Sequence, residues 1–153
     1  MGTLQVYQYV AGSIDGRPIQ LGSLSVARSV TIADDEVTDQ TFKIAASGVV
    51  KVWDSAENES MSGFDFLWME SDRDVWVQFT TSAGSSDVYK VLELAGSGTA
   101  NVMGPALVLG SDDSQLQDGT IDLLDGTADT IDEIWILNQS ASYVARVRVV
   151  VAT

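Results

Sequence analysis

The residues best suited to chemistry are the aspartates of residues 111–133, a stretch with eight acidic residues and no basic one. The candidate ligands for a metal ion are Asp112, Asp113, Asp118, Asp122 and Asp125. Carboxylate oxygens suit Ca²⁺, but the spacing fits neither the EF-hand loop nor the glycine-rich nonapeptide of calcium β-rolls. Aspartate and glycine also form turns, in which the aspartate side chain bonds nearby backbone amides. The sequence therefore leaves a Ca²⁺ site and a series of turns as two open interpretations, and it indicates no other cofactor.

Four further carboxylates could supply the acid and base of a glycosidase. They are Asp65, Glu70, Asp72 and Asp74. The alternative is that they lie in surface turns between strands. The chain has no His and no Cys, which removes the commonest general base, the thiol nucleophile and any disulfide. Because no nucleophile and base arrangement can be assembled without them, we predict that the chain is not an enzyme.

Aromatic side chains offer a third possibility, a platform on which sugar rings could stack. The candidates are Trp53, Trp68, Trp76, Trp135 and Tyr143. Most of them fall in predicted strands, and one face of such a strand must be buried. Core packing is therefore the expectation, and a carbohydrate surface is the alternative.

The charge of the chain is strongly one-sided, with eight basic against 22 acidic residues and a net charge of −14. A field of this sign repels phosphate and anionic lipid, so we predict no nucleic-acid partner and no membrane partner. No apolar stretch reaches the length of a membrane span, and the first residues lack the basic start and apolar core of a signal peptide. The sequence predicts a soluble protein without a cleaved leader.

Short strands are the elements that would position these residues. In residues 143–152, Val147 and Val149 fall on one face and Arg146 and Arg148 on the other. The apolar face of such a strand needs a cover, which a second sheet would provide. Turn residues recur along the whole chain and divide it into nine to eleven short strands with little or no helix. We therefore expect an all-β fold, a two-sheet antiparallel β-sandwich of jelly-roll type.

At this length the chain is predicted to form a single β-sandwich domain, residues 1–153. Residues 1–22 are expected to form an N-terminal arm, with a first strand and then a long loop. Two hairpins are also expected. One joins residues 38–45 to residues 48–53 through a tight turn, and the other joins residues 64–70 to residues 75–80.

Several strand-and-turn segments resemble those of a known group of proteins. The segments are residues 29–34 leading into 42–45, residues 64–72 with 75–79, and residues 134–138 before 145–149. In these segments, and in being acidic and free of His and Cys, the chain resembles the small β-sandwich proteins on the virions of tailed bacteriophages. The resemblance is strongest to the decoration or auxiliary proteins of the head surface.

The resemblance implies a structural role without catalytic or cofactor-binding residues. Such a protein decorates and stabilises a phage capsid through symmetric contacts with the major capsid protein, usually as a homotrimer. It implies a place on the virion head, reached after folding as a soluble protein in the host cytoplasm. The alternative is a receptor- or carbohydrate-binding module of a phage tail or fibre, in which loop aromatics and Ca²⁺ set the specificity.

Overall fold

The computed structural model describes residues 2–7, 9–14, 17–22, 28–32, 36–57, 63–83, 86–109, 116–117, 128–129 and 131–153. In these residues the chain forms fourteen strands and no helix, so nothing described here could cross a membrane as a helix. The strands are β1 (Gly2–Val6), β2 (Tyr9–Ile14), β3 (Arg17–Gly22), β4 (Arg28–Ile32), β5 (Val37–Ile44), β6 (Val49–Asp54), β7 (Phe66–Ser71), β8 (Val75–Ala83), β9 (Ser86–Leu94), β10 (Leu107–Leu109), β11 (Leu116–Gln117), β12 (Ala128–Asp129), β13 (Glu133–Asn138) and β14 (Ala145–Ala152).

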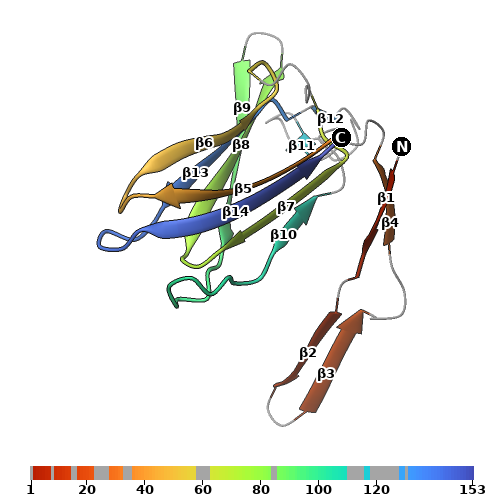
Figure 1. Cartoon of the computed structure of the whole chain (residues 1–153), viewed down its shortest axis with the longest axis vertical. Coiled ribbons are helices and arrows are strands. Elements are labelled where there is room, and N and C mark those ends of the chain that lie inside the picture. The colour runs from red at the N-terminus through yellow and green to blue at the C-terminus, as the bar shows by residue number, and fades with distance from the viewer. Residues whose placement is uncertain are drawn as a thin grey trace.

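Eight of these strands form two antiparallel sheets of four that stack as a sandwich, the body of the molecule (Figure 1). The order in the first sheet is β10-β7-β14-β5, and the order in the second is β6-β13-β8-β9. From β5 to β10, and then from β13 to β14, each strand lies in the sheet opposite its predecessor, except that β9 pairs with β8. This is the strand order of a jelly roll, so the predicted fold class is confirmed.

The core lies between the two sheets and is filled by alternate residues of each strand. In β14, Val147 lies opposite Phe42 of β5 and Ser71 of β7, and its side chain is fully buried. Arg148 points to the outer face, as the alternation predicted. The largest fully buried side chains are Phe79, Leu67, Met69, Ile131, Ile134, Ile136, Val75, Val77, Val147, Val151 and Asn138.

Both predicted hairpins are wrong. β5 and β6 lie in different sheets, and so do β7 and β8. Each short connection crosses from one sheet to the other instead of reversing the chain within one sheet. An apolar face is buried on both strands in either arrangement, so the alternation of side chains does not distinguish a hairpin from a connection between layers.

Buried Asn138 ties two of these connections together. Its Nδ2 donates to the carbonyl oxygens of Ile44 (3.1 Å), Ala45 (3.0 Å) and Tyr143 (2.7 Å). Its Oδ1 accepts a hydrogen bond from the Ser140 N–H (3.0 Å). The turn after β5 and the turn after β13 are therefore held against each other by one side chain.

The first four strands form an N-terminal arm, residues 2–32, beside the body (Figure 1). β1 pairs with β4, and β2 pairs with β3 with Ile14 opposite Arg17. The long loop expected after the first strand is therefore wrong, because the chain there forms the strands β2 and β3. The dipeptide Asp15-Gly16 between them is a strong hairpin signal and could have predicted this pairing. That the whole chain is one domain stays a prediction.

Candidate interaction surface

The outer face of the β10-β7-β14-β5 sheet is divided into an apolar half and a charged half. The apolar patch consists of Phe66, Trp68, Val108, Val150 and Ala152. Pairing across the strands places these side chains together, since Trp68 lies opposite both Val108 and Val150. A β-sheet with two apolar faces needs cover on both, so this patch requires something beyond the second sheet.

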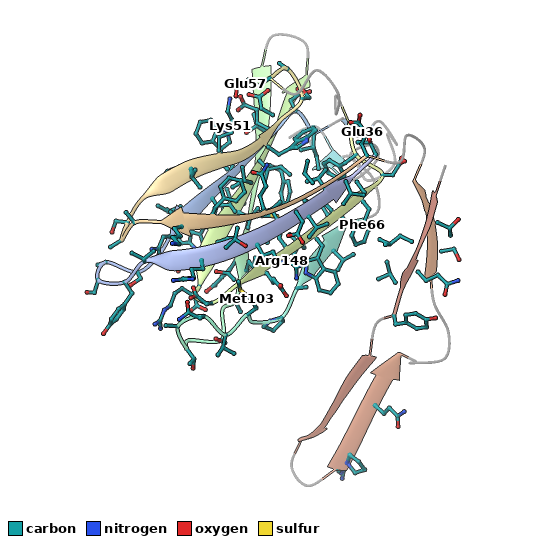
Figure 2. The ribbon with its side chains drawn as sticks, in the orientation of Figure 1. Glu36, Lys51, Glu57, Phe66, Met103 and Arg148 are labelled. Atoms are coloured by element: carbon teal, nitrogen blue, oxygen red, sulfur yellow. The ribbon has the colours of Figure 1, made fainter. Side chains whose placement is uncertain are left out.

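The arm provides part of that cover. Val6 of β1 packs against Phe66 and Ala152, which are 5% and 3% exposed. Figure 2 shows Phe66 on the side of the body that faces the β1–β4 ribbon. The apolar patch is therefore a seat for the arm.

The seat is incompletely filled. A groove of about 340 Å³ remains between β1 and the sheet. It is lined by Leu4, Gln5, Val6, Tyr7, Phe66, Trp68, Arg148 and Val150. Leu4 and Tyr7 stay 37% and 48% exposed beside it. Protein interiors are normally close-packed, so the arm rests on this face without being integrated into the core.

Arg148 borders the groove and organises the charged half of the face. It donates to both carboxylate oxygens of Asp39, from Nε at 2.9 Å and from Nη2 at 2.7 Å, and its Nη1 lies 3.3 Å from Glu70. The hydrogen bond from Arg148 holds the pKa of the Asp39 carboxyl below its usual value, and Asp39 raises the pKa of the guanidinium in turn. This fork leaves the edge of the apolar patch electrically paired.

The arm joins the body at Glu36, which Figure 2 places at the junction between them. Its backbone N–H donates to the Thr153 carbonyl (3.3 Å), and the Thr153 N–H donates to the Glu36 carbonyl (3.0 Å). The chain is thus fixed to the body at the root of the arm. β4 ends four residues earlier, at Ile32.

Arm and body differ in charge. Residues 1–32 contain two arginines and one aspartate, a net charge of +1. The other 121 residues contain six basic and 21 acidic side chains, a net charge of −15. The acidity of the chain therefore belongs entirely to the part outside the arm.

The four carboxylates considered for catalysis have separate partners. Asp72 is 1% exposed, and its two oxygens accept the N–H groups of Arg146 (2.8 Å) and Asn101 (2.9 Å). Asp74 accepts the Gly96 N–H (2.9 Å), so both residues hold the loop that follows β9. Glu70 instead pairs with Arg148 on the outer face, and Asp65 is half-buried with interactions of its own. Asp72 and Asp74 serve as backbone anchors in this geometry.

The aromatic candidates are spread over the molecule. Trp53 is in the core, edge-on to Phe64 with ring centroids 5.3 Å apart, as core packing predicted. Trp68 belongs to the apolar patch, and Tyr143 is exposed in the turn after β13 with the Arg73 guanidinium 5.0 Å from its ring. Core packing is wrong for Trp76, which is 48% exposed on β8.

Trp76 shares the outer face of the second sheet with half-buried Trp135. Trp76 lies opposite Leu137, and Trp135 lies opposite Gln78, so the two indoles are diagonal neighbours. The opposite parity of Trp76 to the buried Val75 and Val77 was the signal that could have placed it outside.

An ion-pair cluster lies at the open side of the sandwich, where β5 and β6 are edge strands of opposite sheets. Lys51 donates to Asp54 and, at 3.1 Å, to Glu57, and its Nζ lies 5.6 Å from the Trp135 ring centroid. Figure 2 shows Lys51 and Glu57 together at this edge. The hydrogen bond from Lys51 holds the pKa of the Asp54 carboxyl below its usual value. The cluster borders a cavity of about 290 Å³ that reaches Trp53 and Val149.

The predicted Ca²⁺ ligands, Asp112, Asp113, Asp118, Asp122 and Asp125, lie outside the described residues. Within the described residues, no group of three or more Asp, Glu, His or Cys side chains is arranged to hold a metal ion. The Ca²⁺ site stays a prediction.

In comparisons with known proteins, no family model, no curated protein and no solved structure matches the chain. Function must therefore be inferred from the surfaces described above.

Proposed function

We propose that this chain is a non-enzymatic structural protein of a tailed-bacteriophage virion, which decorates and stabilises the head surface through symmetric protein–protein contacts. Its partners in this role are the major capsid protein and other copies of itself, as a homotrimer. The segment resemblance described above suggests this class of protein, and the arm is the structural observation that supports it. The protein would fold in the host cytoplasm before it reaches the head.

The arm has the properties of a contact device. It is built from two-stranded ribbons, which are marginally stable in water unless they pack on something else. Figure 1 shows the β2–β3 hairpin at the far end of the arm, pointing away from both sheets. A segment of this kind gains its order by binding, and here the binding surface would be another protein.

The charge distribution supports the same role. Bodies with a net charge of −15 repel one another and repel DNA, which keeps particles dispersed. The arm, at +1, is the part of the chain that can approach an acidic protein surface without that repulsion. Many identical contacts of modest strength, repeated by the symmetry of a shell, would then stabilise it without any one contact being strong.

Quantitative mass spectrometry of virions purified from the phage that encodes this chain would test the proposal. We expect a copy number comparable to the number of capsomers, scaled against the major capsid protein. A handful of copies per particle would instead indicate a tail or fibre component, and absence from the particle would overturn a virion role altogether.

A second function, a receptor- or carbohydrate-binding module of a tail or fibre, is favoured by the exposed face around Trp76 and Trp135. Indole rings on a flat sheet face suit the apolar faces of sugars. Glycan-array binding that is lost in Trp76→Ala would support this function. The matched control is Val91→Ala, which removes a similarly exposed apolar side chain from the neighbouring strand β9. An array without any bound glycan would count against it.

A further inference from the structure

We propose that the arm is exchanged between copies of this chain, so that the β1–β4 ribbon of one copy lies on the apolar patch of a neighbour. The occupant of the patch is thus the arm of a second copy. This inference rests on the self-association in the proposed function and names the surfaces that produce it.

The patch already shows which kind of segment it accepts. Val6 covers Phe66 and Ala152 so well that both are nearly inaccessible, although they lie on the outer face of the sheet. A neighbour's arm would offer the same Val6 and Leu4 to the same residues. Exchange of an identical element between copies keeps the native contacts and needs no new surface, which makes it a low-cost route to an oligomer.

Two features favour the exchanged arrangement over the one within a single chain. The groove of about 340 Å³ shows that the arm does not pack closely against its own body. The β2–β3 hairpin points away from its own two sheets, so only another molecule can cover it (Figure 1). In an exchanged oligomer the hairpin lies beyond the neighbour's patch, where it adds contacts that a lone copy lacks.

Charge also favours a neighbour's arm. An arm of +1 is attracted to a body of −15, whereas two bodies repel each other. Copies are therefore drawn together through arm and body and are kept apart elsewhere. This selects an interface in which the arm is the intermediary.

The root of the arm limits the geometry. Glu36 is bonded to Thr153, and four residues of extended chain from there to Ile32 span at most about 14 Å. Partner bodies must therefore be adjacent, with the root of one beside the patch of the other. Passing each arm to the next copy in one direction closes a ring such as a trimer, and mutual exchange closes a dimer.

The test uses the absence of Cys, which makes engineered thiols the only ones in the chain. Val6→Cys places a thiol on the arm, and Val150→Cys places one beside the apolar patch. The two full-length variants are mixed, incubated and treated with a short bis-maleimide. Exchange predicts a covalent dimer that contains one chain of each variant, because the arm thiol of one copy meets the body thiol of another.

The control for random collision mixes Val6→Cys with Val102→Cys, whose side chain is exposed in a loop of the body. The double variant Val6→Cys, Val150→Cys shows that the two positions lie within reach of the reagent. Cross-links confined to single chains of the double variant, with a mixed pair no better than the control, would overturn the exchange.

A second measurement does not depend on cross-linking. Val6→Asp puts a charge into the seat, and Thr3→Asp puts the same charge on the same strand at an exposed position. We expect sedimentation velocity to show that Val6→Asp raises the dissociation constant for self-association at least about tenfold, while Thr3→Asp changes it little. A full-length wild type that stays monomeric at every concentration would also overturn the inference. Virion copy number is measured separately, so exchange could fail while the proposed function stands.

Discussion

In the body, each strand of the two sheets places one face against the other sheet, and β14 has a pairing partner on both sides, β5 and β7. In the arm, β1 pairs with β4 and β2 pairs with β3 as two-stranded ribbons. The body buries Phe79 and Leu67 completely or nearly so, whereas Leu4 and Tyr7 of the arm remain partly exposed.

The difference teaches that pairing alone does not make a stable unit. Backbone hydrogen bonds are satisfied in both regions, but only stacked sheets bury enough apolar surface to offset the loss of chain entropy. The arm must therefore take its stability from a surface outside itself. This is the physical reason to assign binding to the arm and support to the body.

Amide hydrogen exchange would measure the comparison directly and should give the largest effect. We expect amides of β14 to exchange through global unfolding, and those of β2 and β3 to exchange through local opening that costs about 5 kcal/mol less or better. Protection in β1 and β4 should rise with protein concentration if arms are exchanged.

The comparison would fail if β2 and β3 were protected as strongly as β14 in a dilute, monomeric sample. Such a result would mean that the arm is part of the cooperative unit. It would remove the argument that the arm needs a partner.

Core truncation should have the next largest effect. Phe79→Ala removes a fully buried ring between the sheets and should lower the free energy of unfolding by about 3–5 kcal/mol, as measured by urea denaturation. Trp76→Ala on the same strand is the matched control, because its exposed side chain should contribute within about 0.5 kcal/mol. Equal losses in the two variants would contradict the assignment of the inner and outer faces of β8.

The anchors of the loops should matter less than the core. Asp72→Asn replaces one of two acceptors with a donor that faces an N–H group, and should cost about 1–3 kcal/mol. Asp74→Asn, which affects a single bond from Gly96, should cost less than about 1 kcal/mol. Loss of stability is the expected readout, measured again by urea denaturation. A variant Asp72→Asn as stable as the wild type would contradict the anchoring role.

The sequence predicted the faces of strands better than it predicted their partners. The alternation in residues 143–152 placed Val147 inside and Arg148 outside, because side-chain parity is a local property. The two predicted hairpins were wrong, because a short turn between two amphipathic strands suits both a hairpin and a connection between layers. Partner choice depends on the whole sandwich, which no local window contains.

The anchors were beyond the reach of pattern for a similar reason. Asp72 bonds a backbone amide 74 residues away, and Asn138 bonds a carbonyl 94 residues away. Residue type alone suggested a catalytic carboxylate for one, and nothing singled out the other. The arm was partly predictable, since Asp15-Gly16 is a hairpin signal, but its seat on Phe66 depends on the parity of β7 and on an outward apolar face that became visible only in three dimensions.

Acid should weaken the body while leaving the arm unaffected, and this effect should be the smallest of the four. Lys51 holds the pKa of the Asp54 carboxyl below its model value of 3.8, so the native state binds that proton less tightly than the unfolded state. The pair therefore stabilises the fold above about pH 4, and its contribution is lost as the pH falls through the lowered pKa. Wild type should melt above Asp54→Asn at neutral pH, and the difference should shrink on acidification. Glu57→Gln, at a more exposed partner of Lys51, should show a smaller difference. A gap between wild type and Asp54→Asn that stays constant down to pH 2 would mean that the ion pair does not contribute to the stability of the body.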